Sequence, residues 1–272
     1  MIRTDTHLHT SFSSDSDSPM ESMILKGIQL GLAAICFTDH HDIDFPDNPE
    51  NLDFLLDPDS YYNAWKQSEE KYAGRIEILH GIELGIQPHL GEKLNKFMDQ
   101  YGERYDFIIA SCHVVDQMDP YEPLYFNTLG TRKGMRKYYE TIYQNLMVFD
   151  QYQTVGHLDY AARYIKKPVP TFHYADYADI LDEILSFIIN NDKALEINTS
   201  GLKAGLPWPN PHMSILKRYK QLGGERITIG SDAHKPEHMA YGFHLLPGIL
   251  KEAGFDHYEI YRKKQPFLIA AE

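Results

Sequence analysis

Cysteine is scarce in this chain, which has two cysteines among 272 residues, Cys36 and Cys112. Each lies inside an apolar run of the strand type, where an unpaired thiol usually behaves as a small buried hydrophobic group. We therefore expect neither a disulfide nor a catalytic thiol.

Long apolar runs and a basic excess are also missing. No stretch reaches the roughly 18 apolar residues of a membrane span, and the first residues lack the charged-then-apolar pattern of a secretory signal. Lysine and arginine number 26 against 39 aspartates and glutamates, so the formal net charge is −13. A chain this acidic repels nucleic acid unless it keeps a local basic groove. We expect a soluble cytoplasmic protein that acts on a small molecule, without nucleic acid or membrane as partners.

Strand-type and helix-type segments alternate along the chain, which is typical of a parallel sheet with crossover helices. A chain of this length with 43% hydrophobic residues can bury one large core, so we expect a single domain over residues 1–272. Strands are predicted near 2–7, 33–37, 76–83, 106–112, 152–157, 194–198 and 226–231. Helices are predicted near 20–30, 60–73, 92–101, 132–148, 176–190, 212–222 and 247–253. Seven strands rather than eight indicate an irregular or incomplete α/β barrel.

Residues of the kinds that bind metals follow the predicted strands. His7 and His9 are two positions apart in an extended segment, so their side chains share one face. Others of these types come after later apolar runs: His40, Glu83, His113, His157, Asp232 and His234. Barrel enzymes build their active sites at the carboxyl ends of the strands, where these residues would meet. The proline-containing segment 42–59 is predicted to be a long loop forming one wall of the site.

Imidazoles and carboxylates suit zinc, manganese or iron, and several such ions close together are typical of enzymes that hydrolyse phosphate esters. A histidine taken alone is more often a satisfied polar group at a strand end, so the hypothesis depends on the whole set. A structural zinc site is a weaker alternative. Such sites usually close four ligands over a short span and favour cysteine, whereas these residues span almost the whole chain.

The ordered motifs together resemble the PHP family, which is named for polymerase and histidinol phosphatase. The motifs are Asp5-Thr-His7-Leu-His9, Phe37-Thr-Asp39-His40, Glu83, His113, Gly156-His157 and Ser231-Asp232-Ala-His234. Within the family, Phe12-Ser13-Ser14-Asp15 and His41-Asp-Ile-Asp-Phe-Pro46 are most similar to stand-alone histidinol-phosphate phosphatases. The resemblance implies a distorted (β/α)7 barrel and the hydrolysis of L-histidinol phosphate to L-histidinol and phosphate in histidine biosynthesis.

The resemblance also implies two or three divalent metal ions, with zinc, manganese and iron as candidates. The first would be held by His7, His9, Glu83 and Asp232. Glu83 would bridge to a second, completed by His113 and His157. The third would be held by Asp15, His40 and His234, and some relatives carry a histidine where this chain has Asp15. Without the resemblance, Asp15 is equally well explained as a turn residue of the polar stretch 13–18.

We hypothesise that a hydroxide bridging the first two metals attacks phosphorus, because coordination lowers the pKa of bound water towards about 7. Asp232 would orient this nucleophile or take its proton. The leaving alkoxide would be protonated by His234 or by a water, and the sequence leaves this choice open. Two other functions also stay open: a PHP phosphoesterase acting on a nucleotide or phosphoprotein, and a metal-binding scaffold without turnover.

Substrate binding needs groups beyond the metals. Arg163, six residues after His157, could place its guanidinium fork on a phosphate, although an exposed cation at a helix start is an equally good interpretation. In similar phosphatases a basic residue, usually arginine, is presented near the position of Lys203, and lysine lacks the fork. The loops 42–45 and 116–119 offer carboxylates for the cationic end of the substrate.

Overall fold

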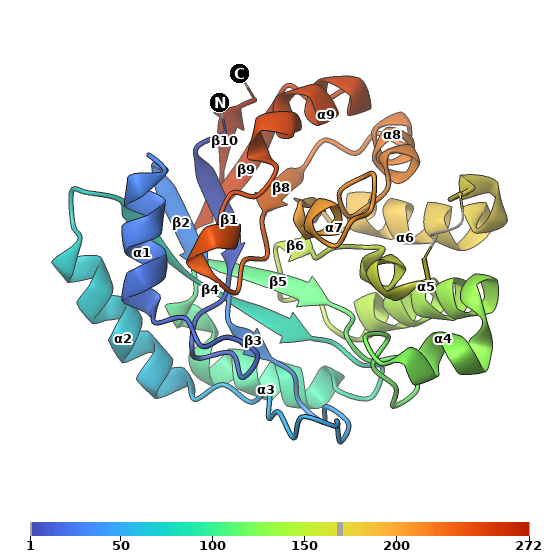
Figure 1. The fold of residues 1–272 in the computed structure, drawn as a ribbon, viewed down its shortest axis with the longest axis horizontal. Helices are drawn as coiled ribbons and strands as arrows, with labels where there is room; N and C mark the ends of the chain where they lie inside the picture. The colour runs from blue at the N-terminus through green and yellow to red at the C-terminus, as the bar shows by residue number, and fades with distance from the viewer. Residues whose placement is uncertain (1, 168–170, 272) are drawn as a thin grey trace.

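The computed structural model describes residues 2–167 and 171–271. Seven parallel strands form a nearly closed barrel, with helices around the outside (Figure 1). In barrel order they are β1 (Thr4–Leu8), β2 (Ala34–Phe37), β4 (Glu77–Gly85), β5 (Phe107–Ser111), β6 (Thr154–Val155), β7 (Ala194–Asn198) and β8 (Ile227–Gly230). A parallel bridge between Leu8 and Ala233 joins the two ends of this sheet. The predicted seven-stranded barrel is confirmed.

The helices are α1 (Met20–Gln29), α2 (Pro58–Lys71), α3 (Gly91–Tyr101), α4 (Pro123–Leu129), α5 (Thr131–Val148), α6 (Ala178–Asn190), α7 (Ser200–Lys203), α8 (Met213–Gln221) and α9 (Leu246–Ala253). The longer helices cover the outside of the barrel because they present an apolar face to the strands, whereas the short α7 lies beside the cavity described below. Short 3₁₀ turns are η1 (Gly102–Arg104), η2 (Tyr160–Tyr164), η3 (Tyr174–Asp176), η4 (Pro236–His238) and η5 (Phe243–Leu245). On α6 the buried residues recur every three or four positions, as expected for a helix packed on a sheet: Ile180, Leu181, Ile184, Leu185 and Ile188.

The segment after β2 does two things for the site. The short strand β3 (His40–His41) pairs in parallel with β4 and places His40 directly beside Glu83. The chain then continues without regular structure until α2, where Asp57 accepts hydrogen bonds from the first backbone N–H groups and Pro58 occupies the first turn. In this loop, Phe54 lines the cavity described below, so the predicted wall is confirmed.

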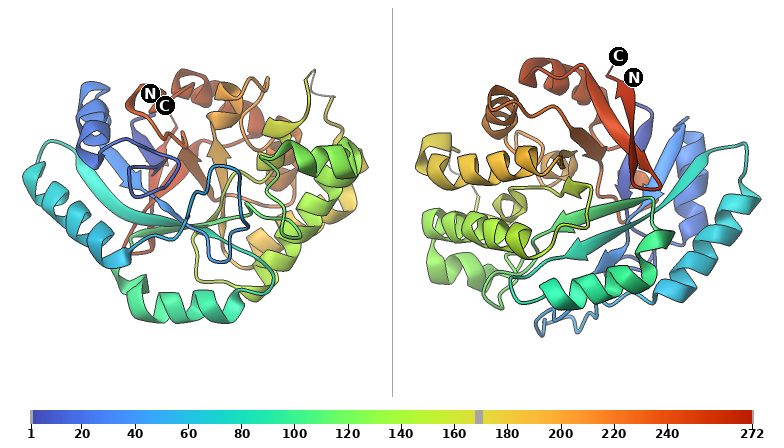
Figure 2. Two further views of the ribbon diagram at one scale, coloured as in Figure 1. Left: turned by 60° about the horizontal axis from the view of Figure 1, so that its bottom comes forward. Right: turned by 180° about the vertical axis from the view of Figure 1, so that it is seen from behind.

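A hairpin at the carboxyl end of the chain was not predicted. Its strands are β9 (His257–Arg262) and β10 (Gln265–Ala270), which pair antiparallel. Tyr261 joins a buried apolar cluster with Cys36, Leu79, Phe107 and Ile109, and Arg262 pairs with Glu77 at the start of β4. Seen from behind, the hairpin lies at the end of the barrel where the strands begin (Figure 2). It fills the amino-terminal end, so the opposite end is the one available for a site.

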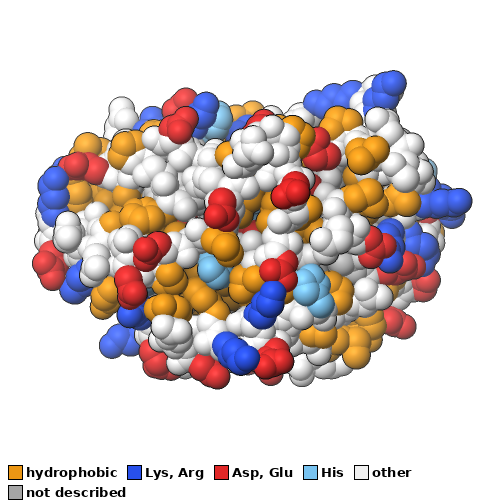
Figure 3. All heavy atoms as spheres, turned by 90° about the horizontal axis from the view of Figure 1, so that it is seen from below, with side chains coloured by type: hydrophobic (Ala, Val, Ile, Leu, Met, Phe, Trp, Pro, Cys, Tyr) orange, Lys and Arg blue, Asp and Glu red, His pale blue; other side chains and the backbone are white. Residues whose placement is uncertain are grey.

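Two further expectations concern sulfur and charge. Cys36 and Cys112 are both free and buried, as predicted. Basic and acidic side chains are interspersed on the face shown in Figure 3 rather than gathered by sign. None of the helices that the structure describes is long and apolar enough to cross a membrane.

Candidate metal centre

Glu83 occupies the middle of the site. It lies near the end of β4 with no exposed surface, and histidine nitrogens from several strands face its two carboxylate oxygens. The distances are 3.2 Å to His7 Nε2, 3.5 Å to His9 Nε2, 3.0 Å to His40 Nδ1, 3.3 Å to His113 Nε2 and 2.9 Å to His157 Nε2. Parallel strands end at the same edge of a barrel, which explains why residues so distant in sequence meet here.

Asp232 follows β8 with a left-handed backbone conformation, φ 55°, and its two oxygens face different neighbours. Oδ1 lies 3.4 Å from His9 Nε2 and 3.9 Å from His7 Nε2, inside the cluster. Oδ2 accepts a hydrogen bond from Arg163 at 2.9 Å. Asp232 therefore connects the histidine cluster with the positively charged side chain of Arg163 beside it.

A third group lies at the edge of the cluster. Asp15 Oδ2 is 3.0 Å from His234 Nε2 and 3.7 Å from His40 Nε2. The ring of His9 stacks on those of His40 and His234, with centroids 4.2 and 4.0 Å away, and the centroids of His40 and His234 are 5.7 Å apart. All nine residues predicted as metal ligands thus lie in one continuous cluster.

The donor atoms fit divalent cations. Several buried nitrogens and oxygens here have no hydrogen-bond partner within the described residues: His7 Nε2, His9 Nε2, His40 Nδ1, Glu83 Oε2 and His234 Nε2. Leaving so many buried polar atoms unpaired is costly, and a bound metal would satisfy them. The ligand atoms also fall into groups within 4.8 Å of one another, among them His7-His9-Glu83, Glu83-His113-His157 and His9-His40-His234.

The electrostatics match what metal binding requires. Burial alone would raise the pKa of Glu83, but the surrounding histidines hold it well below its usual value, so the carboxylate is charged. Burial and the neighbouring imidazoles of His234 and His40 hold the pKa of His9 well below its usual value, which keeps its nitrogen free to bind. The pKa of His7 is instead raised by Glu196, Glu83 and Asp232 against the effect of burial. Metal binding would therefore release protons.

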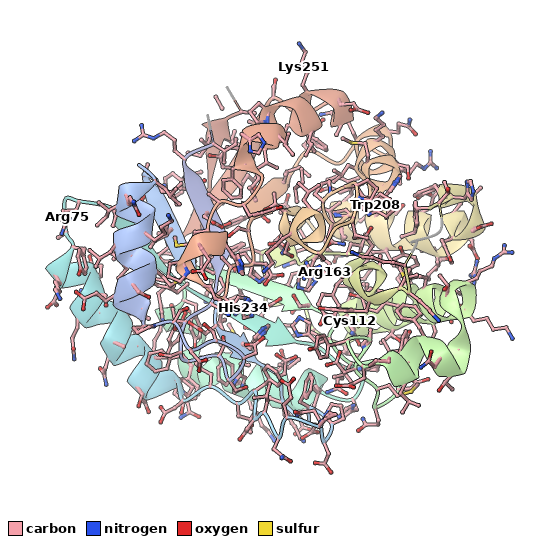
Figure 4. The ribbon with its side chains drawn as sticks, viewed as in Figure 1. Arg75, Cys112, Arg163, Trp208, His234 and Lys251 are labelled. Atoms are coloured by element: carbon pink, nitrogen blue, oxygen red, sulfur yellow. The ribbon has the colours of Figure 1, made fainter. Side chains whose placement is uncertain are left out.

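A cavity of about 490 Å³ opens beside the cluster, and a smaller one of about 100 Å³ shares several of its walls. Asp15, Asp232 and His234 line both cavities, and Figure 4 shows His234 and Arg163 over the middle of the barrel. Other lining residues are Asp17, Glu50, Phe54, Asp119, Glu122, Tyr160, Arg163, Tyr164 and Lys203. The cavity thus combines two basic side chains with a set of acidic and aromatic ones.

The two predicted phosphate-binding residues both face this cavity, but they are held differently. The Arg163 side chain is 7% exposed, and its guanidinium donates to Asp232, to Asn198 at 3.2 Å and to Asn210 at 2.7 Å. It is therefore not the exposed cation of the alternative interpretation. Lys203 Nζ lies 3.5 Å from His238 Nδ1. Burial lowers the pKa of Lys203.

Sequence reasoning missed two buried carboxylates next to the cluster. Glu196 Oε1 lies 2.6 Å from His7 Nδ1, and Asp42 Oδ1 lies 2.7 Å from His113 Nδ1. Glu196 lies inside an apolar strand, and a carboxylate in a buried strand was the one sign in the sequence of a buried partner. Asp42 was considered only for substrate binding. His41 beside His40 faces away from the site, because its Nδ1 accepts the Leu56 N–H.

The fold and site define a class of protein: α/β barrels with a cluster of histidines and carboxylates suited to metal ions at the carboxyl ends of their strands. A model of the PHP domain family matches residues 5–200, and the chain belongs to this family. It is 32% identical over 256 residues to a histidinol-phosphatase from Lactococcus lactis, covering 94% of this chain and 93% of that one. A probable histidinol-phosphatase from Clostridium acetobutylicum is also 32% identical, over 88% of this chain and 89% of its own.

Solved structures agree with these sequence comparisons. The crystal structure of histidinol phosphate phosphatase from Lactococcus lactis, complexed with zinc, L-histidinol and phosphate, superposes with a TM-score of 0.87 at 30% identity. The match covers 97% of this chain and 98% of that one. The resemblance inferred from the motifs is therefore confirmed.

Proposed function

We propose that this chain is a metal-dependent phosphatase that hydrolyses L-histidinol phosphate to L-histidinol and phosphate, with residues 1–272 acting as one phosphoesterase domain. The observation that carries the proposal is the cluster of histidines and carboxylates around Glu83, which opens into a cavity with Arg163 and Lys203 on its wall. The relatives named for this activity, and the zinc, histidinol and phosphate of the related crystal structure, support the same substrate.

For the ligands, we propose the three sets inferred from the family. His7, His9, Glu83 and Asp232 would hold the first metal, Glu83, His113 and His157 the second, and Asp15, His40 and His234 the third. Two or three zinc, manganese or iron ions in these positions would neutralise phosphate oxygens and make a coordinated water more acidic.

The phosphate would lie between the metals and Arg163. Three acceptors fix the guanidinium by one N–H each, and the remaining donors are free to reach a phosphate from the cavity wall. Lys203 would add a second positive charge without the planar fork. Both side chains are also close enough to Asp232 to interact with its charge.

Asp232 is better suited to orienting the attacking water than to taking its proton. Burial would raise the pKa of this carboxyl, but His7 and Arg163 hold it well below its usual value. A carboxylate held in this way accepts a hydrogen bond and is a weak base. His234, 20% exposed at the cavity edge, or a cavity water would protonate the leaving oxygen.

The cationic end of the substrate would meet Asp119. Of the two loops considered from the sequence, Asp44 pairs with Lys93 and Asp116 with Lys137, both on the outer surface. Asp119 lines both cavities instead, and one of its oxygens accepts the Tyr121 N–H at 2.8 Å. Its other oxygen is available for an ammonium or imidazolium group.

The test is phosphate release by protein reconstituted with zinc or manganese. L-Histidinol phosphate is compared with 4-nitrophenyl phosphate and adenosine 3′,5′-bisphosphate at equal concentrations. We expect a preference for L-histidinol phosphate of about a hundredfold or more in kcat/KM, which is about 2.7 kcal/mol of differential transition-state binding. Preference for the nucleotide would mean that the protein is a phosphatase with a different substrate. No phosphate release from any of the three esters would contradict phosphatase activity.

A further inference from the structure

Two buried carboxylates outside the proposed ligand set face the histidines of the centre in the same way. Glu196 accepts from His7 Nδ1 at 2.6 Å, and His7 Nε2 then lies 3.2 Å from Glu83. Asp42 accepts from His113 Nδ1 at 2.7 Å, and His113 Nε2 lies 3.3 Å from Glu83. Glu196 is 1% exposed and Asp42 is 3% exposed, so neither can be satisfied by bulk water.

This geometry selects one tautomer of each histidine. A neutral imidazole has one N–H and one lone pair, and a carboxylate at Nδ1 holds the proton there. The lone pair of Nε2 is then directed at Glu83, where a cation would bind. Without the carboxylate, the ring could turn or carry its proton on the wrong nitrogen, and metal affinity would fall.

Glu196 restrains a second strand as well. Its Oε2 accepts the backbone N–H of His157 at 2.8 Å and the side-chain amide of Asn198 at 3.1 Å. One carboxylate on β7 therefore fixes His7 at the end of β1 and the backbone of His157 after β6. These two histidines belong to different proposed metals, so the effect of Glu196 extends beyond one ligand.

Glycines make room for both carboxylates. A Cβ added at Gly230 would overlap the Cβ of His7 and lie 2.7 Å from Glu196 Oε1, and one added at Gly85 would overlap Asp42 Oδ1. Neither glycine has a positive φ, so backbone conformation does not require glycine at these positions. The space taken by the carboxylates and by His7 does.

We propose that Glu196 and Asp42 are positioning residues of the metal centre, which hold His7 and His113 with Nε2 directed at Glu83, and that Gly230 and Gly85 are needed to accommodate them. The inference rests on the metal centre of the proposed function, and metal affinity tests it separately from phosphatase activity.

The first experiment measures zinc affinity by chelator competition for Glu196→Gln and for Asp42→Ala, which removes the acceptor of the His113 Nδ1–H, together with the visible spectrum of the Co²⁺-loaded proteins. We expect affinity to fall by about 10- to 100-fold and the Co²⁺ spectrum to change. His7 and the His157 N–H face different oxygens of Glu196, so in Glu196→Gln one of these two donors meets an NH2 group instead of an acceptor. Glu259→Gln is the matched control. Glu259 is a buried carboxylate on β9, at the other end of the barrel, and it pairs with Arg226.

The second experiment tests the glycines, with Gly248→Ala on α9 as the control because a Cβ there meets no atom within 4 Å. Gly230→Ala and Gly85→Ala should weaken zinc binding and change the Co²⁺ spectrum as the carboxylate variants do, and Gly248→Ala should do neither. Folded carboxylate variants with wild-type zinc affinity and Co²⁺ spectrum would overturn the proposal. Equal losses in Glu259→Gln would also overturn it, since the effect would then be general destabilisation. If the variants show altered zinc affinity but the wild-type protein releases no phosphate, the proposed function is contradicted and the positioning role is not.

Discussion

Arg163, the proposed phosphate-binding residue, has its side chain held in place by its neighbours. Its guanidinium is nearly enclosed and is fixed by Asn198, Asn210 and Asp232, and it also lies over the ring of Tyr160, 4.9 Å from the centroid. A long side chain held in this way loses little additional freedom when it binds. The side chain is already ordered in the folded state, which would strengthen its contact with a phosphate in the proposed site.

Replacing Arg163 by methionine should therefore lower kcat/KM for L-histidinol phosphate by about 10²- to 10³-fold, the usual effect of removing one preorganised donor. Steady-state kinetics at constant metal content measure it. Arg136→Met is the control, because Arg136 pairs with Asp179 on the surface. Unchanged kinetics in Arg163→Met would remove this residue from the phosphate site.

Asp119 should determine how well the cationic end of the substrate binds. Asp119→Asn keeps the size of the side chain and the acceptor for the Tyr121 N–H, but removes the negative charge. Because a charge-assisted hydrogen bond contributes about 1.5–3 kcal/mol, we expect KM for L-histidinol phosphate to rise at least about tenfold. KM for 4-nitrophenyl phosphate, which has no cationic group, should not change.

Asp116→Asn is the control for Asp119→Asn, since Asp116 lies in the same loop and pairs with Lys137. Burial raises the pKa of Asp119 to about 6, so its negative charge is lost as the pH falls through about 6. The KM difference between wild type and Asp119→Asn should therefore shrink below that pH. An equal rise in KM for both esters would exclude a role in recognising the cation.

At the residue scale, the nine clustered residues were accessible from the sequence because each member follows an apolar strand-type run or belongs to a motif of the family, and their role as metal ligands stays a proposal. Glu196 and Asp42 were not accessible, because their roles depend on which histidine faces them across the barrel. Glu196 even precedes the end of its strand, where a carboxylate has no local signal of a partner. Sequence patterns of this kind locate strand ends but not the orientation of the side chains that meet there.

Elements were predicted well where one face is apolar and poorly where local signals are weak. The strands from β1 to β8 on the barrel path and the long helices appear close to their expected positions. The β9–β10 hairpin was missed because its turn, Lys263-Lys264, has positive φ values of 49° and 63° without the asparagine or glycine that usually marks such a turn. The residues that it contacts at the barrel end, such as Cys36 and Glu77, are also distant in sequence, so no local pattern indicates them.

His80 on β4 connects this strand with α2 and gives the protein a pH-dependent stability away from the site. Its ring packs on Trp65 and Tyr105, and its Nδ1 lies 2.9 Å from the Arg104 carbonyl oxygen. Burial lowers the pKa of His80 from 6.5 to about 4. The folded state therefore disfavours the protonated ring.

Because the folded-state pKa lies below the unfolded one, the stability from His80 is fully present above pH 6.5 and is lost as the pH falls towards 4. The loss is about 3 kcal/mol on complete protonation. His80→Gln should make the free energy of unfolding less dependent on pH between these values, as measured by urea unfolding of the metal-free protein. An identical slope in wild type and His80→Gln would contradict the prediction.

At the scale of the whole molecule, the site forms only when the first and last strands of the barrel come together. The match to the family model ends at residue 200, yet Asp232 and His234 lie after β8 and complete the cluster that begins with His7. The bridge between Leu8 and Ala233 and the hydrogen bond from Asp232 N to the His7 carbonyl oxygen bring the two ends of the sheet together. The site is thus a property of the complete barrel.

Metal removal should therefore destabilise the whole barrel as well as abolish activity. Cations bound among ligands from β1, β4 and β8 would connect strands at the start, middle and end of the chain, and ligand binding to the folded state adds stability by mass action. At a free metal concentration of 100 times Kd, one site contributes about 2.7 kcal/mol, which corresponds to about 5–10 °C in Tm for a chain of this size. We expect calorimetry to show a fall of at least this size after chelation, with recovery when zinc or manganese is restored. An unchanged Tm, with metal loss verified by elemental analysis, would mean that the cluster does not connect the strands through a cation.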